Sequence, residues 1–451
     1  MIQPEPLRFS LALRFWLKLG FISFGGPAGQ IAILHQELVE KRLWISEQRF
    51  LHALNFCMLL PGPEAQQLAI YLGWLLHKTR GGLAAGILFV LPSWFILVAL
   101  SWVYMAFGNV VWIAAVFYAI KPAVMAIVLM AAYRMGRRSL RNRGLACLAG
   151  VSLLCSYFWE LPFPLLLASA GLIGFLGSRY APKTFDIGLA HGQPAKSYGA
   201  ALIDDHASQP DHTRFSWTRQ IAVLLTGFLL WAVPMGCLLV QYGWRHGLTQ
   251  MAWFFSKVTL FTFGGAYAVL PYVYQGAVEH FHWLLPQQML DGLALGETTP
   301  GPLIMIVTFA GFVAGWSQAL LGPEQLVWGG VLAALIVTYF TFLPSFVFVF
   351  AGGPLIESSR GNLKLSAPLL AISATVVGLI VNLAFFFGWH VFWPQGWDGY
   401  FDWVAAIIGS CALLALFKFK LGVIPVIVLS AVAGLLLAAA KSWLPGLGPV
   451  F

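Results

Sequence analysis

Long apolar stretches recur along the whole chain and are separated by short polar ones. Stretches of about 20 apolar residues are typical of helices that cross a bilayer. About 13 such spans are predicted, near residues 10–27, 48–76, 82–107, 110–132, 144–158, 161–178, 218–241, 251–271, 290–316, 326–351, 367–388, 402–417 and 421–441. The pattern therefore predicts an all-α polytopic membrane protein.

Composition supports this fold class. The 451 residues are 59% hydrophobic and 10% charged, and the mean hydropathy is +0.80, whereas soluble domains carry about 25% charged residues. The first apolar stretch contains Arg14 and Lys18 and lacks a small-residue cleavage site, so we interpret it as a retained span. No long segment is polar enough to form a separate soluble domain.

The distribution of basic residues predicts the topology. With the N-terminus in the cytoplasm, the inner loops hold 18 Lys and Arg residues and the outer loops hold five. This asymmetry matches the positive-inside rule and predicts a periplasmic C-terminus. The net charge of +9, including the five arginines in 134–143, is then mostly a topology signal. We do not expect a nucleic-acid interface.

The chain contains an internal repeat. Residues 15–63 align with residues 254–302 at a constant offset of 239 without a gap, and 15 of the 49 pairs are identical. The shared residues include a lysine, an F-G-G motif and a P-G-P motif. Further along, L-P-S at 91–93 matches L-P-S at 343–345. Such self-similarity is typical of transporters built from two related halves.

The two halves are predicted to be inverted in the membrane. Each half has six predicted spans, and one further span lies between them, which turns the second half over. The loops after the second and fourth spans are basic in the first half and lack Lys and Arg in the second, whereas the loops after the third and fifth spans show the reverse pattern. The loop after the first span has a charge balance near zero in both halves. The expected units are a first repeat (1–178), a cytoplasmic linker (179–217), a linking transmembrane helix (218–249) and a second, inverted repeat (250–451).

Two pairs of helix breaks are the candidate binding region. Proline blocks continuation of a helix and glycine permits close backbone approach. Irregular backbone at membrane depth must line a cavity or lie inside protein, and a helix that restarts there points free N–H groups at an anion. The motif residues are Gly25, Gly26, Pro61, Gly62, Pro63, Gly264, Gly265, Pro300, Gly301 and Pro302.

Charged and polar residues near the breaks are further candidates. Lys18 and Lys257 occupy equivalent repeat positions and could neutralise one anion, although snorkelling to an interface would also explain them. Glu64 and Glu297 flank the P-G-P motifs and are candidates for carrying a coupling proton. The candidate hydrogen-bonding residues are Ser23, Gln66, Gln67, Thr262, Thr298 and Thr299.

These residues also carry a family resemblance. The motifs are S-F-G-G-P at 23–27, W-I-S-E at 44–47, L-P-G-P-E-A-Q-Q-L-A-I-Y-L-G-W at 60–74, E-T-T-P-G-P at 297–302 and F-K-F-K-L-G-V-I-P at 417–425. With them the sequence resembles the chromate ion transporter (CHR) family in its long, two-domain bacterial form. The resemblance implies a multi-pass inner-membrane protein that exports chromate from the cytoplasm and confers chromate resistance.

The second half departs from the first at two motif positions. Ala266 replaces the proline after F-G-G, and Leu303 replaces the glutamate after P-G-P. The two halves therefore need not contribute equally to binding. Our hypothesis is that the chromate dianion binds between them and that rocking of one half alternates access.

Other functions remain as alternatives. A transporter of sulfate or of tetrahedral oxyanions in general is the nearest one. A membrane-embedded enzyme is a weaker alternative, because H-E-x-x-H and nucleotide-binding loops are absent. The five scattered cysteines predict neither disulfides nor a metal site, and no cofactor is expected. The lipid bilayer is the expected environment, and a homodimer is compatible with the sequence.

Overall fold

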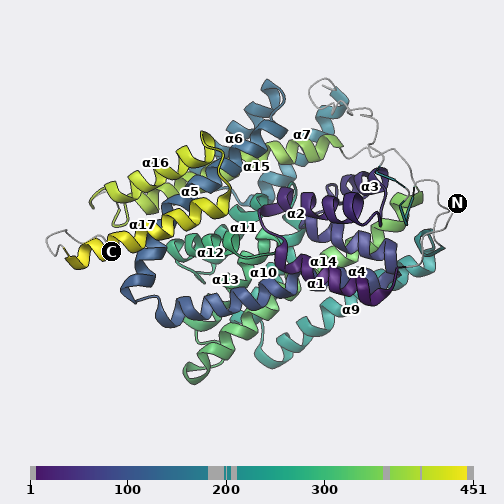
Figure 1. Cartoon of the computed structure of the whole chain (residues 1–451), viewed down its shortest axis with the longest axis horizontal. Coiled ribbons are helices and arrows are strands. Elements are labelled where there is room, and N and C mark those ends of the chain that lie inside the picture. The colour runs from purple at the N-terminus through teal and green to yellow at the C-terminus, as the bar shows by residue number, and fades with distance from the viewer. Residues whose placement is uncertain are drawn as a thin grey trace.

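The computed structural model describes residues 7–180, 198–199, 201–204, 211–358, 366–396 and 399–443 (Figure 1). In these ranges the regular secondary structure is helical. Before the linker the helices are α1 (Phe9–Ile22), α2 (Gly26–His35), η1 (Gln36–Lys41), α3 (Glu47–Cys57), α4 (Glu64–Phe107), α5 (Val111–Ser139), α6 (Arg143–Trp159) and α7 (Phe163–Tyr180).

The later helices follow the same order. They are η2 (Asp211–Thr213), α9 (Trp217–Tyr242), α10 (Gly247–Val258), η3 (Thr259–Phe261), η4 (Ala266–Val269), α11 (Leu270–Tyr274), η5 (Gln275–His280), α12 (Pro286–Thr298), η6 (Leu303–Met305), α13 (Ile306–Ser317), η7 (Pro323–Gln325), α14 (Leu326–Ser358), α15 (Ser366–Phe392), α16 (Trp403–Phe417) and α17 (Val423–Trp443).

The predicted fold class is confirmed as an all-α polytopic membrane protein. In the described part of the chain, seven helices are long and apolar enough to cross a membrane: α4, α5, α7, α9, α14, α15 and α17. Three shorter apolar segments add to them, at Arg143–Trp159, Leu303–Ser317 and Trp403–Phe417. The first two predicted spans of each half are each interrupted between helices, and the total of 13 spans stays a prediction.

The repeat seen in the sequence recurs in the backbone. The π-helices η1 and η5 lie 239 residues apart, at 36–41 and 275–280. Leu43 and His282, also 239 residues apart, share the unusual φ of 52°. Since a positive φ is strained for residues other than glycine, its recurrence at equivalent positions shows that the two segments adopt the same local fold.

The long helix α4 corresponds to two helices of the second half. It bends sharply at His77 and Lys78, whose backbone angles are not helical. In the second half the chain leaves the helix altogether between α13 and α14. The bend explains why the sequence predicts separate spans ending near residue 76 and starting near residue 82.

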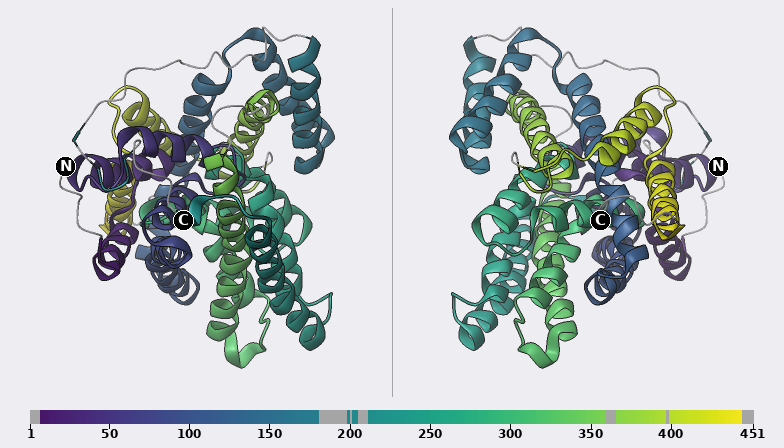
Figure 2. Two further views of the ribbon diagram at one scale, coloured as in Figure 1. Left: turned by 90° about the vertical axis from the view of Figure 1, so that its right-hand side faces the viewer. Right: turned by 90° about the vertical axis from the view of Figure 1, so that its left-hand side faces the viewer.

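The two halves interlock through a shared core. The larger buried cluster combines first-half residues of α5, such as Val124 and Ile127, with second-half residues of α10, α12, α13 and α15. α16 and α17 lie beside α5 at one end of the molecule, and α1 and α3 lie toward the other end, where the N-terminus is (Figure 1). In Figure 2 the α6–α7 pair projects from the top of the molecule and the turn between α13 and α14 lies at the bottom.

The linking helix α9 lies on the outside. Phe228 and Val233 are each 59% exposed and Val240 is 90% exposed. Apolar side chains along a peripheral helix suit contact with lipid tails, because exposed apolar patches of this extent are rare on soluble monomers. α9 thus fits the predicted role of a membrane helix.

Part of the predicted linker is attached to the first half. The amide of Ile203 donates to the carbonyl of Trp44 at 3.0 Å, and Ser46 donates to Ile203 at 3.0 Å. Ile203 also forms an isolated parallel bridge with Ile45. The remainder of the predicted linker, at 181–197, 200 and 205–210, lies outside the described residues.

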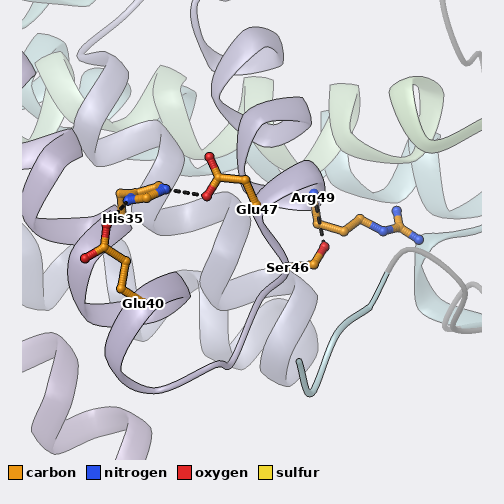
Figure 3. Close-up of polar contacts among 5 residues, drawn as sticks. All are labelled: His35, Glu40, Ser46, Glu47 and Arg49. Carbon is orange, nitrogen blue, oxygen red and sulfur yellow. Dashed lines mark hydrogen bonds and ion pairs between the residues drawn. The ribbon is translucent and has the colours of Figure 1, made fainter. Parts of the chain in front are cut away.

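A cluster of polar contacts fixes the turn between α2 and α3 (Figure 3). His35 Nε2 lies 2.5 Å from a carboxylate oxygen of Glu47, and Nδ1 lies 3.3 Å from Glu40. Ser46 caps α3 by accepting a hydrogen bond from the backbone N–H of Arg49 at 3.2 Å. This cluster holds the linker-contacting loop against the first half.

Candidate functional site

The four helix breaks meet in two reciprocal pairs. The N–H of Gly62, in the first P-G-P, donates to the carbonyl of Thr262, next to the second F-G-G, at 2.8 Å. The N–H of Gly301, in the second P-G-P, donates to the carbonyl of Ser23, next to the first F-G-G, at 2.7 Å. Each half therefore supplies the carbonyl group that accepts a hydrogen bond from the P-G-P glycine of the other half.

The glycines of the two P-G-P motifs are required by backbone geometry and by space. Gly62 has φ +136° and Gly301 has φ +105°, a region that L side chains rarely adopt. A Cβ on Gly62 would lie 2.4 Å from Gln67 Nε2 and 2.9 Å from Ser345 Oγ. A Cβ on Gly301 would lie 2.8 Å from the Cβ of Ser93. The crossing is packed tightly around both glycines.

Buried polar atoms without partners surround this crossing. Ser93 and Ser345, which are repeat equivalents, are fully buried, and neither hydroxyl has a hydrogen-bond partner among the described residues. The side-chain amide of Gln66 is also buried and unpartnered at both its oxygen and its nitrogen. Buried polar groups are almost always paired, so a group of unpaired ones points to a place for water or a polar ligand.

Two glutamines brace the motifs themselves. Gln67 Nε2 donates to the carbonyl of Pro61 at 2.7 Å. Gln30 Nε2 donates to the carbonyl of Gly301, 271 residues away. Gln66 and Gln67 were predicted from the sequence, whereas Gln30, Ser93 and Ser345 were not. The matching L-P-S motifs were the only sequence signal for the two serines.

The predicted hydroxyl donors are already used within their own helices. Ser23 Oγ donates to the carbonyl of Leu19 at 2.6 Å, and Thr262 Oγ1 donates to that of Val258 at 2.8 Å. Thr298 and Thr299 likewise donate to carbonyls in their preceding turn. In this conformation these hydroxyls stabilise the ends of broken helices, and their predicted contact with an anion stays a prediction.

Both predicted acids are buried beside the breaks. Glu64 is 7% exposed at the first position of α4, directly after Pro63. Glu297 is 6% exposed and accepts a hydrogen bond from the hydroxyl of Tyr267. Arg138 interacts electrostatically with Glu64, and Arg134 with Glu297. The two acids thus lie near the same end of α5.

The printed contacts of the two predicted lysines are with residues outside the four helix breaks. Lys18 is exposed. The hydrogen bond from Lys41 is the largest cause that lowers the pKa of Glu37, and the nearby charges of Lys18 and Arg42 lower it further. Lys257 is partly buried, with Nζ 5.4 Å from the centre of the Trp253 ring. The shared role of these two lysines at one anion stays a prediction.

Two buried ionic clusters hold the short helices α3 and α12 in place. Arg49 of α3 donates to Glu357 of α14 at 2.7 Å, and the hydroxyl of Tyr71 donates to the same carboxylate at 2.6 Å. In α12, Asp291 accepts from the hydroxyl of Tyr104 at 2.9 Å and lies 3.6 Å from Lys121 Nζ. Each short helix next to a P-G-P break is thus anchored to a long helix.

Metal-binding geometry is not found in the described ranges. There, no group of three or more His, Cys, Asp and Glu side chains could hold an ion. All five cysteines have free thiols.

Comparisons with known proteins agree with the motifs. The family described as "Chromate transporter" matches residues 11–175 and 249–435, which cover most of both halves. The chain is 31% identical to a chromate transport protein of Pseudomonas aeruginosa over 96% of this chain and 93% of that one. It is 28% identical to a probable chromate transport protein of Synechococcus elongatus over 94% of both chains.

A third relative is a chromate transport protein of Cupriavidus metallidurans, 28% identical over 82% of this chain and 80% of that one. No solved structure matches the chain. The relatives are transport proteins, and the family match spans both sets of helix breaks. The chain therefore belongs to the chromate transporter family and is a multi-pass membrane transporter.

Proposed function

We propose that this protein exports chromate from the cytoplasm across the bacterial inner membrane and so confers chromate resistance. The observation that carries the proposal is the reciprocal crossing of the breaks, where Gly62 and Gly301 bond to the opposite half. Unpartnered polar groups at Gln66, Ser93 and Ser345 would bind the anion there. Family membership supplies the substrate class.

The proposal includes an inverted arrangement of two halves, at 1–178 and 250–451, joined by the linker at 179–217 and the helix at 218–249. The paired π-helices and the recurring φ of 52° support duplication, and the loop charges support inversion. The N-terminus would then lie in the cytoplasm and the C-terminus in the periplasm. Each half would present its P-G-P motif to the shared site.

Transport would follow the membrane potential. Chromate is largely a dianion near neutral pH, and its exit from a negative interior is favourable by about 4.6 kcal/mol per 100 mV, twice the value for one charge. Rocking of one half against the other would open the crossing alternately to each side. Glu64 and Glu297 are the groups that could couple protons to this movement.

Chromate flux tests the proposal directly. Everted membrane vesicles containing the protein are expected to accumulate radiolabelled chromate when an inside-positive potential is imposed, and vesicles without it are not. A tenfold excess of sulfate distinguishes a chromate transporter from a transporter of tetrahedral oxyanions in general. Accumulation that persists in sulfate supports chromate transport, while equal flux of labelled sulfate would favour a general oxyanion transporter. No accumulation under any potential or pH gradient would contradict the proposal.

The lysines are tested in the same assay. We expect Lys257→Ala to raise the KM for chromate about tenfold, and Lys18→Ala to raise it less, because Lys257 is the more buried of the two. Lys41→Ala is the control, since this exposed lysine pairs with the buried Glu37 and is not a candidate site residue. Unchanged KM in both variants would remove the lysines from the site and leave the transport function intact.

A further inference from the structure

A cavity of about 610 Å³ opens beside the C-terminal end of α5. Four cations line it: Arg134, Arg137, Arg138 and Lys420. The other lining residues include Tyr133 and Phe417, whose ring centres lie 5.2 Å apart, and no acidic residue is among them. We call these four cations the basic vestibule.

The basic vestibule adjoins the helix breaks of both halves. Arg138 donates to the sulfur of Met58 at 3.3 Å, and Met58 lies three residues before Pro61 of the first P-G-P. On the same turn of α5, Met135 packs against the second F-G-G, where a Cβ on Gly264 would lie 2.9 Å from Met135 Cε. The last turns of α5 thus cover a break from each half.

The cation cluster has no counterpart at the equivalent positions of the other half. The offset of 246 that aligns Pro122 with Pro368 places apolar residues of α15 opposite the three arginines. They are Ile380, Leu383 and Ala384. Lys420 and Glu160 each lie in the turn between the last two helices of their half, with φ of 53° and 48°. The position equivalent to the lysine of the vestibule is therefore occupied by a glutamate in the first half.

This asymmetry distinguishes the vestibule from the duplicated site. A duplicated binding site would carry similar charges in both halves, whereas the four cations of the basic vestibule have no equivalent cluster in the other half. Clefts lined by one sign of charge concentrate counter-ions and raise their rate of association by about 10- to 1,000-fold. The arrangement suits capture of an anion on one side and release on the other.

We propose that the basic vestibule is the capture site for tetrahedral oxyanion dianions, which it concentrates and delivers to the crossing of the breaks. This assignment rests on the proposed transport function for its role in flux, but the binding itself is a separate property. The vestibule acts before the crossing and on the face that the positive-inside rule places in the cytoplasm. Because the vestibule is present on one face only, the anion would enter the crossing faster from that face.

Kinetics in everted vesicles test the role in capture. The variant combines Arg134→Gln, Arg137→Gln and Lys420→Gln, and it retains Arg138 because that residue contacts Met58. We expect the KM for chromate at low ionic strength to rise about tenfold, with Vmax within about twofold of wild type. The difference is expected to vanish in about 1 M salt, where the Debye length is about 3 Å.

The control neutralises two arginines of the same basic run that do not line the cavity, Arg141→Gln with Arg143→Gln. Both side chains are exposed, and their loss is expected to leave the KM within about twofold. An unchanged KM with a lower Vmax in the triple variant would overturn the proposal, because the cations would then act on folding or on the conformational step. An equal rise of KM in the control would also overturn it.

Equilibrium dialysis of sodium chromate against the purified full chain separates this inference from the transport function. In nanodiscs of zwitterionic phosphatidylcholine, the triple variant is expected to bind chromate about tenfold more weakly than wild type. If wild-type vesicles transport nothing while this difference is found, the transport function fails and the capture site stands. Equal binding by both proteins would overturn the capture site.

The phosphate group of an anionic lipid is the alternative ligand for the same four cations. Adding about one third phosphatidylglycerol to the nanodiscs is expected to leave chromate binding by wild type within about twofold. If the anionic lipid abolishes chromate binding by wild type and is itself enriched only around wild type, the vestibule is a lipid headgroup site. That outcome would overturn capture of the free oxyanion.

Discussion

Alanine at Gly62 or Gly301 is expected to reduce chromate transport at least 100-fold while the protein still reaches the membrane. Each glycine has a positive φ and donates a backbone hydrogen bond to the opposite half. A strained backbone costs about 1–3 kcal/mol at such a residue. A Cβ on Gly62 would in addition displace Gln67 and Ser345 from the crossing. The measurement is initial chromate uptake into everted vesicles, normalised to transporter abundance.

Gly236→Ala provides the matched control. Gly236 lies within α9, where nothing occupies the 4 Å around an added Cβ, and alanine favours a helix by about 1 kcal/mol over glycine. Its transport is therefore expected to match wild type. Wild-type rates in both Gly62→Ala and Gly301→Ala would contradict the placement of the substrate site at the crossing. Loss in only one variant would assign the larger share of binding to that half.

Glu357→Ala is expected to destabilise the protein by about 3–5 kcal/mol, because it removes the carboxylate that accepts from both Arg49 and Tyr71. All three side chains are buried, and a buried ion pair that loses one partner leaves an uncompensated charge. The readout is the thermal midpoint of detergent-solubilised protein, followed by fluorescence-detected size exclusion. We expect the midpoint to fall by several degrees and the abundance in membranes to fall with it.

A paired replacement distinguishes charge compensation from simple loss of packing. Arg49→Met combined with Glu357→Leu removes both charges and keeps apolar volume, so its midpoint is expected to lie closer to wild type than that of Glu357→Ala. Glu324→Ala is the surface control, because Glu324 is exposed in η7, and such changes alter stability by about 0.5 kcal/mol or less. A Glu357→Ala midpoint equal to that of Glu324→Ala would show that this cluster does not stabilise the fold.

Local signals in the sequence were sufficient for the helices and their breaks. Apolar stretches predict the long helices, since hydropathy reports directly on burial in lipid. F-G-G and P-G-P predict the breaks, because proline ends a helix and glycine tolerates unusual backbone angles. The bend at His77 and Lys78 divides α4 where the sequence predicts a gap between two spans, because the polar run H-K-T-R at 77–80 interrupts the apolar pattern.

The composition of the site depends on contacts that are remote in sequence. Gln30 reaches Gly301 across 271 residues, and Arg49 reaches Glu357 across 308. No local pattern specifies such pairs. The unpartnered hydroxyls of Ser93 and Ser345 became recognisable only when the structure showed them packed against Gly301 and Gly62. For Lys18 and Lys257, equivalence in the repeat predicted a shared task, but their burial differs because the two halves have different neighbours.

The reciprocal bonds of Gly62 and Gly301 also constrain how such a transporter can be divided. A polypeptide carrying a single copy of the repeat would leave the glycine amide of its P-G-P motif without the carbonyl that accepts from it here. It would have to obtain that carbonyl from another molecule, so a chain with one repeat is expected to work as a pair of chains. With both copies in one chain, their stoichiometry is fixed at one to one and each copy can carry different side chains, as the placement of the arginines near α5 illustrates.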